Sequence, residues 1–138
     1  MDFENKEQWA EAVKMYERLV KAYPQSTRAA ETLYRLGITY ANNLKDFKKA
    51  VETHGRIVKE YPNSNFVKQS TFMMGFLYAN DLKDLEKAKS AYQDFLQKWP
   101  THELASSVKW ELEHLGQDIS QIDLNLGEAQ PAADTPIK

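Results

Sequence analysis

The sequence of 138 residues contains no cysteine. Disulfide scaffolds, cysteine-ligated zinc, iron–sulfur clusters and thiol nucleophiles are therefore excluded. Long apolar runs are also missing, because no segment approaches the roughly 18 consecutive apolar residues of a membrane-spanning helix. Residues Met1 to Gln8 are polar and acidic, unlike a signal peptide. We expect no direct insertion into a membrane.

Neither sign of charge dominates, since 18 Lys and Arg residues face 20 Asp and Glu residues and the formal net charge is −2. Such a balance gives no long-range attraction to phosphate backbones, so we expect no nucleic-acid partner. With 42% hydrophobic and 12% aromatic residues, the chain can build one modest core. Its length predicts a single domain.

Proline is scarce, but three of the five prolines are regularly spaced. Pro24, Pro62 and Pro100 are 38 residues apart, and each follows an aromatic residue. Residues 24–61 and 62–99 align without gaps, with 11 of 38 positions identical. Self-similarity at such a period indicates a repeat architecture.

Each unit predicts two helices, which we call the A helix and the B helix. The A helices are expected at 28–41 and 66–79 and the B helices at 47–61 and 85–99, from apolar residues at helical spacing. Polar residues at 25–27 and 63–65 are placed to cap the A helices, and Asp46 and Asp84 the B helices. Each proline then ends the B helix before it.

The ends of the chain are half repeats in this register. Residues 4–23 predict a B helix without its A helix, and 102–115 predict a capping A helix without a B helix, followed by Gly116 as a left-handed cap. The repeat domain thus spans 1–116 with six helices. The prolines and acidic residues of 117–138 predict a disordered tail.

Four marks in each unit resemble the tetratricopeptide family, TPR for short. They stand as Gly37, Tyr40, Ala50 and Pro62, and again as Gly75, Tyr78, Ala88 and Pro100, while Ala12 and Pro24 keep the same distance. The resemblance implies an all-α, right-handed solenoid of antiparallel hairpins. The glycines let the A helix approach the B helix closely, and we expect Ala12, Ala50 and Ala88 to form the small surface opposite.

The 38-residue unit is four residues longer than is usual in this family. It is similar to the envelope branch, such as the Tol–Pal coordinator protein and the outer-membrane assembly lipoprotein of bacteria. This resemblance implies a periplasmic or envelope-associated protein, with a cytoplasmic location as the alternative.

The resemblance also implies that ligands bind along the A helices. The candidate residues form columns with a 38-residue spacing: Tyr34, Phe72 and Trp110; Ile38, Phe76 and His114; and Asn42 and Asn80. If exposed, they make an aromatic groove for a protein or peptide. The alternative for the first column is packing between neighbouring A helices. Ile38 and Phe76 lie off the buried face, so we expect them to be exposed.

The unpaired first helix suggests a second function. Trp9, Val13 and Tyr16 fall where a missing A helix would cover them, so this end is expected to join a second copy, another subunit or a longer parent chain. The two hypotheses are therefore a non-catalytic binding scaffold and a structural assembly subunit.

Catalysis and metal binding have little support in the sequence. There is no glycine-rich phosphate loop or serine nucleophile motif, and His54, His102 and His114 are too widely spaced to predict converging ligands. His54 takes the register of Tyr16 and Tyr92, so we expect it to replace a half-buried aromatic. We predict a protein without enzymatic activity, metal or cofactor.

Overall fold

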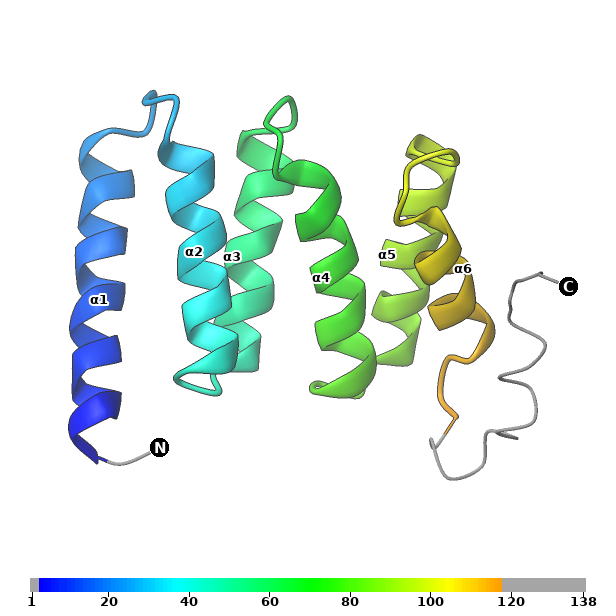
Figure 1. The fold of residues 1–138 in the computed structure, drawn as a ribbon, viewed down its shortest axis with the longest axis horizontal. Helices are drawn as coiled ribbons and strands as arrows, with labels where there is room; N and C mark the ends of the chain where they lie inside the picture. The colour runs from blue at the N-terminus through cyan, green and yellow to red at the C-terminus, as the bar shows by residue number, and fades with distance from the viewer. Residues whose placement is uncertain (1–2, 118–138) are drawn as a thin grey trace, which may run out of the picture.

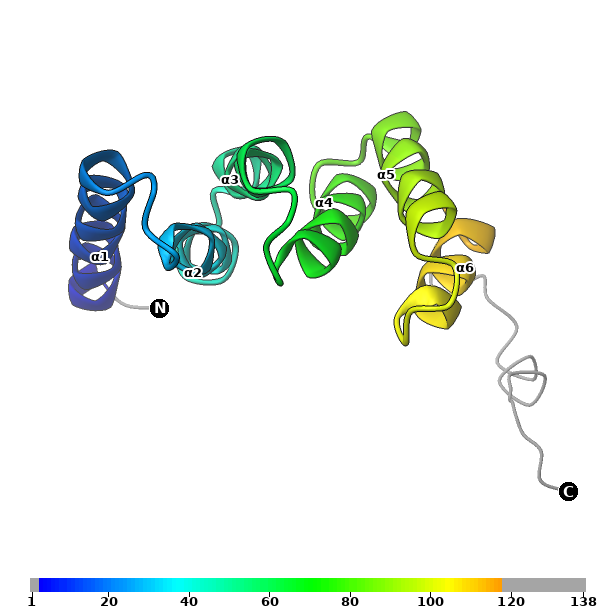
Figure 2. The same ribbon diagram turned by 90° about the horizontal axis from the view of Figure 1, so that it is seen from above.

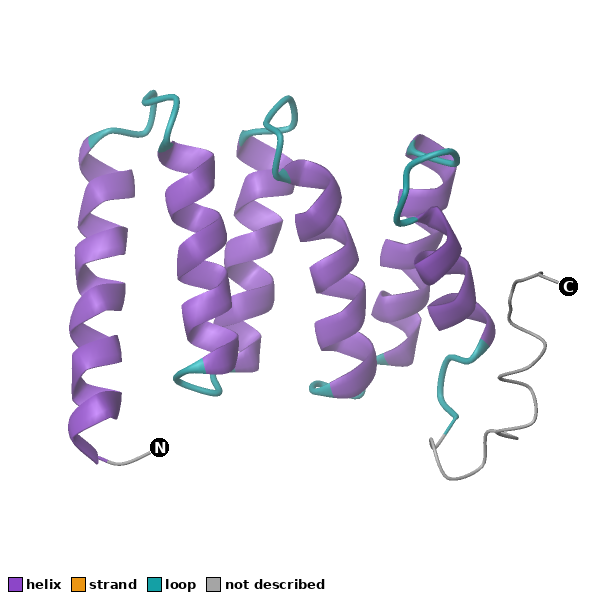
Figure 3. Cartoon of the chain, in the orientation of Figure 1, coloured by secondary structure: helices purple, strands orange, loops and turns teal. Residues whose placement is uncertain are grey.

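The computed structural model describes residues 3–117, and within them every regular element is a helix (Figure 3). The order is α1 (Phe3–Ala22), α2 (Ala29–Asn42), α3 (Phe47–Glu60), α4 (Val67–Asn80), α5 (Leu85–Lys98) and α6 (Ala105–Glu113). Successive helices run antiparallel in a single stack from α1 to α6 (Figure 1). The predicted all-α helical solenoid is confirmed. Apart from Gln117, the predicted tail lies outside the described residues.

The helices form two rows. Seen from above, α1, α3 and α5 lie in one row and α2, α4 and α6 in the other (Figure 2). The rows correspond to the predicted B and A helices, so the A helices share one face of the stack. The most extensive helix contacts run between neighbours along the chain, and they are densest within the pairs α2–α3 and α4–α5. Such a stack is stabilised by interfaces between neighbours.

The helix bounds follow from local signals. Asp46 and Asp84 cap α3 and α5, accepting from the backbone N–H of Lys49 at 3.2 Å and of Lys87 at 3.1 Å, as predicted. The loops before these caps contain Lys45 and Lys83, whose φ angles of 56° and 57° are in the left-handed region.

The predicted caps of the A helices are only partly right. Ser26 and Ser64 accept from the backbone N–H groups of Arg28 and Phe66, ahead of helices that begin without a side-chain cap. The last helix, α6, also begins later than the predicted 102–115, because a turn precedes it. His102 sits in the serine register and its Nδ1 accepts from the N–H of Leu104 at 3.0 Å, so residues 102–104 form a turn. Gly116 has the expected left-handed φ of 84°.

The core consists of two clusters along the stack. The larger one joins α1 to α4 around Leu33, Leu36 and Ile57, and the smaller one joins α4 to α6 around Tyr92, Phe95 and Val108. The partly buried Tyr78 packs against both clusters and makes the core continuous.

A polar contact ties α1 to the first hairpin. The Tyr40 hydroxyl donates to Glu17 at 3.1 Å, and Arg56 forms an ion pair with the same carboxylate at 3.2 Å. Burial, together with Glu17, raises the pKa of Tyr40 to about 12. One side chain of α1 therefore holds both helices of the hairpin.

The two helices of each hairpin meet where a ring lies over a glycine. A Cβ atom added to Gly37 would be 2.7 Å from Nε2 of His54, and one added to Gly75 would overlap the ring of Tyr92. The nearest atoms opposite the glycines belong to these rings and not to Ala50 and Ala88, which corrects the sequence-based expectation. The glycines make room for a buried ring.

The cost of filling this space can be tested with glycine-to-alanine variants. We expect Gly75→Ala to lower the free energy of unfolding by about 1 to 3 kcal/mol, because the overlap with Tyr92 outweighs the better helix propensity of alanine. Gly55→Ala is the matched control, since its Cβ would be 3.6 Å from the nearest atom, Cε of Met74. The control should stabilise by about 0.5 to 1 kcal/mol. Urea unfolding measures both, and equal signs would contradict the ring-on-glycine packing.

Candidate protein-binding groove

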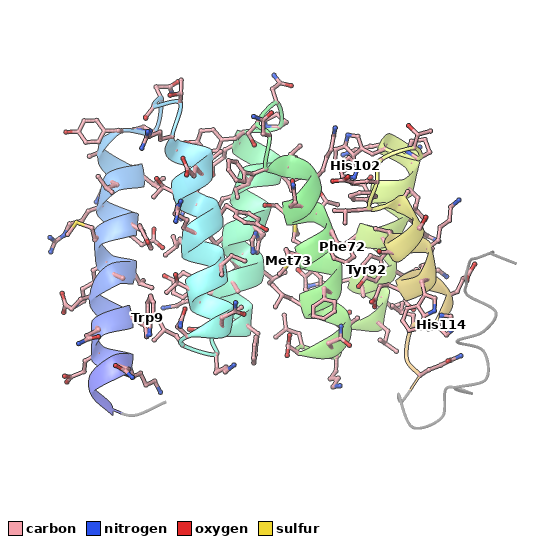
Figure 4. The ribbon with its side chains drawn as sticks, in the orientation of Figure 1. Trp9, Phe72, Met73, Tyr92, His102 and His114 are labelled. Atoms are coloured by element: carbon pink, nitrogen blue, oxygen red, sulfur yellow. The ribbon has the colours of Figure 1, made fainter. Side chains whose placement is uncertain are left out.

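The three residues of the first predicted aromatic column differ in their surroundings: Tyr34 and Phe72 are packed between helices, and Trp110 is exposed. The centroid of the Tyr34 ring lies 5.2 Å from the ring centroid of Phe66 and 5.4 Å from that of His54. Phe72 lies 6.2 Å from Tyr92 and is half-buried (Figure 4). These two rings therefore fill space between helices. Trp110, at the end of the stack, is 39% exposed.

A cleft of 680 Å³ opens where α4, the start of α5 and α6 meet, and we call it the C-terminal cleft. Four predicted residues line it together: Phe76, Asn80, Trp110 and His114. Phe76 is 38% exposed, as its position off the buried face predicted. The ring of His114 stacks on Trp110 with centroids 4.0 Å apart. The cleft thus combines two accessible aromatic rings from neighbouring A helices.

A second cleft, the N-terminal cleft, has a volume of 570 Å³ and lies between α1 and α2. Tyr34 and Ile38 line it with Trp9 and Tyr16, and an ion pair of 3.2 Å between Arg35 and Glu31 forms part of its rim. Ile38 is half-buried and so less exposed than expected. Phe72 and Asn42 line neither cleft, so the eight candidate residues do not form one continuous groove.

The C-terminal cleft carries charges of both signs that the sequence patterns did not point to. Its wall contains the charged side chains of Lys83 and Glu111, together with Leu85. Burial raises the pKa of Glu111, while His114 opposes the shift. The "Leu-Lys-Asp" triplet repeated at 44–46 and 82–84 is the signal that could have pointed to Lys83, because its left-handed backbone closes the loop at the cleft.

The buried ring next to this cleft has an unusual hydroxyl. The Tyr92 side chain is fully buried, and its hydroxyl has no hydrogen-bond partner within the described residues. Burial, with a smaller contribution from Glu111, raises its pKa. A neutral tyrosine of raised pKa beside a single carboxylate does not form an acid–base pair for catalysis at neutral pH. The site is suited to binding.

The three histidines serve separate structural purposes. His54 is fully buried, not half-buried as expected, and its Nδ1 lies 3.2 Å from the hydroxyl oxygen of Ser70. His102 closes the turn before α6, and Nδ1 of His114 lies 2.8 Å from the carbonyl oxygen of Trp110. Among residues 3–117, no three His, Asp or Glu side chains gather in a way that could hold a metal ion.

Helix α1 presents a broader apolar surface than the sequence predicted. Val13 and Tyr16 are partly buried and pack against the larger core cluster. Trp9 is 37% exposed and lines the N-terminal cleft. Met15, Leu19 and, directly after the helix, Tyr23 are more exposed still, and the sequence patterns did not point to them.

Residues 3–131 match the YfiO family, described as outer membrane lipoprotein. The chain belongs to the YfiO family. The match covers the whole helical stack, and it extends past residue 116, where the sequence analysis ended the repeat domain. No curated protein is significantly similar to the chain in sequence.

Membership of the YfiO family confirms the envelope association that the TPR-like repeat implied. It supports a role in protein interaction or assembly at the outer membrane, rather than an enzymatic one. In the part of the chain from residue 3 to 117, no helix combines the length and apolar character needed to cross a bilayer.

The buried His54 makes stability depend on pH. Burial lowers its pKa to about 4, from an ordinary value of 6.5. Between these values the unfolded chain binds a proton that the folded chain does not, so stability falls as the pH drops from 6.5 towards 4, by about 3 kcal/mol in all. Urea unfolding at pH 7 and pH 5 should show this loss in the wild type and a smaller one in His54→Gln. Because the raised pKa of Glu111 acts in the opposite direction, the difference between the two proteins is the decisive measurement. Equal pH slopes would contradict the assignment.

Proposed function

We propose that this YfiO-family chain is a non-catalytic scaffold that binds a protein or peptide along its A-helix face, with the C-terminal cleft as the main site. One observation carries the proposal. Phe76 and Trp110, from neighbouring A helices, are both more than one third exposed and line the same cleft of 680 Å³. Exposed aromatic side chains around a concave surface are typical of protein interaction sites.

The wall of the cleft indicates the chemistry of the ligand. An apolar side chain of the partner would insert between Phe76 and Trp110, and polar groups flanking it would meet Lys83 and Glu111. The Asn80 amide already donates to the carbonyl oxygen of Phe76 at 3.0 Å, which leaves its own oxygen to accept from a peptide N–H. An extended segment or a short helix fits this arrangement.

The mechanism is preorganisation. Phe76 is 6.4 Å from the ring of Phe72, which packs on Tyr92, and Trp110 is stacked on His114. Because packing already restricts both rings, binding costs little side-chain entropy on the side of the scaffold. The resemblance of the 38-residue repeat to the Tol–Pal coordinator protein stays a prediction. A protein of that type would also act as a scaffold.

A second candidate function is assembly through α1. It is favoured by the open residues Met15, Leu19 and Tyr23, which lie at the opposite end of the stack from the C-terminal cleft. The two functions use different surfaces, so they do not exclude each other.

Charge insertion at Phe76 tests the groove. Peptides selected from a random library on the immobilised wild-type chain should bind Phe76→Asp at least about 10-fold more weakly, because truncated aromatic anchors cost this much or more. Binding is followed by the fluorescence of Trp110, in a background in which the other two tryptophans are replaced by phenylalanine. Gln97→Asp, an equal charge change on the exposed part of α5, is the control. Unchanged affinity in Phe76→Asp, or equal losses in both variants, would overturn the proposal.

A further inference from the structure

Helix α1 exposes positions that the complete hairpins bury. Leu19 is in the register of Ile57 in α3 and Phe95 in α5, one and two periods further on. Ile57 and Phe95 are 0% exposed, whereas Leu19 is 43% exposed. The difference arises because α2 and α4 cover the B helices that follow them, and the described chain has no A helix before α1. Among the described residues, Leu19 therefore stands at a core position with no helix packed over it.

The exposed core position is part of a stripe. Ala12, Met15 and Leu19 of α1 recur at spacings of three and four residues, which places them on one face of the helix. Tyr23 follows directly after the helix at the same spacing, and its backbone N–H donates to the carbonyl oxygen of Leu19 at 2.9 Å. We call this set the outer stripe. Met15 is 56% exposed, and Ala12 is half-buried although its counterparts Ala50 and Ala88 are fully buried. A stripe of this kind fits the apolar face of another helix.

The repeat shows how such a helix would run. In both complete hairpins the covering A helix is antiparallel to its B helix (Figure 1). Helix α6 of a second copy is poorly suited, because its Lys109 and Glu113 stand in the registers of Leu33, which is fully buried in the larger core cluster, and of Gly37, which lies against His54 of the B helix. The candidate cover is thus an antiparallel helix with an apolar stripe of its own.

The charges of α1 are divided along its length. Its first half holds Glu7 and Glu11 beside one lysine, Lys6, and its second half holds Lys14, Arg18 and Lys21, all of them exposed. Glu11 also forms an ion pair of 3.5 Å with Lys14 of the same helix, which leaves Arg18 and Lys21 as the basic end. The acid of the second half, Glu17, faces the hairpin and pairs with Arg56. A second α1 laid antiparallel places the acidic half of one helix beside the basic half of the other, whereas a parallel arrangement would bring like charges together.

We propose that α1 binds α1 of a second copy of this chain, antiparallel, in a twofold symmetric dimer. With the axis near Met15, Leu19 of one copy lies beside Ala12 of the other, a large side chain against a small one. Glu11 and Arg18 of opposite copies then differ in height by roughly 1.5 Å, from the rise per residue. The dimer rests on the assembly role proposed for α1 and is independent of the groove.

The first test is the mass in solution by light scattering coupled to size exclusion. The wild-type chain should run at twice its 16.0 kDa, and Leu19→Glu should run as the monomer with an unchanged helical circular dichroism spectrum. Leu85→Glu changes an equally exposed leucine on α5 and should leave the dimer intact. A monomeric wild-type chain, or a dimer that survives Leu19→Glu, overturns the inference.

The second test identifies the partner as a second copy. Glu11→Arg or Arg18→Glu alone should weaken the dimer on the order of 10-fold, since each brings like charges together at two symmetric contacts. The double variant carries both changes in each copy and should regain wild-type affinity. A double variant as weak as the singles would overturn the antiparallel pairing.

A photo-crosslinking residue at position 19 distinguishes the dimer from assembly through α1 with a different protein. Cross-linking in cells to a second copy supports the dimer. Cross-linking to a different protein alone overturns the dimer and leaves the assembly role in place, and no cross-link at all removes both.

Discussion

The stack depends on one contact that occurs once in each complete hairpin. A ring on the B helix lies over a glycine of the A helix, His54 over Gly37 and Tyr92 over Gly75. Both rings are fully buried, so neither can move aside for a side chain at the glycine. The contact sets how closely two helices approach, and its recurrence after 38 residues makes the hairpins alike. A glycine in mid-helix is unfavourable by about 1 kcal/mol relative to alanine, and the buried ring compensates for this.

The same rings also join each hairpin to the next. His54 approaches Ser70 of α4 and packs edge-on against Tyr34 of α2. Tyr92 packs against Phe72 of α4, and Glu111 of α6 adds to the rise in its pKa. Each ring therefore has a neighbouring helix on both sides. Tyr16 holds this register in α1 but has only α2 to pack against, and it lines the N-terminal cleft. Within the described residues, Tyr16 thus holds the ring register without a glycine-bearing A helix before it.

The sequence predicts the period and the helices well, because prolines, caps and apolar spacing are local signals. Helices α2 to α5 agree with the predicted bounds to within a residue. The predictions that failed concern contacts between helices, because they depend on which neighbouring side chain fills the space between two helices. Alanines were expected opposite the glycines, but the longer side chains at His54 and Tyr92 reach there first. Tyr34 and Phe72 share a column with Trp110, yet of the three only Trp110 is more than one third exposed, since it has no hairpin beyond it among the described residues. Val13 and Tyr16 are partly buried against the larger core cluster, whereas the more exposed Met15 and Leu19 of α1 were not selected from the sequence.

The two proposed surfaces together define a form of scaffold that neither defines alone. The outer stripe lies on α1 and the C-terminal cleft is lined by residues of α4, α5 and α6, and α1 and α6 are at opposite ends of the stack (Figure 1). A twofold dimer through α1 would therefore leave the C-terminal cleft of each copy free. The two C-terminal clefts would then lie at opposite ends of a stack of twice the length. Two weak sites at a fixed separation bind a partner with two matching segments far more tightly than either site alone, provided that the linker between the segments spans the distance. Such a dimer would select partners by the spacing of their segments as well as by their side chains.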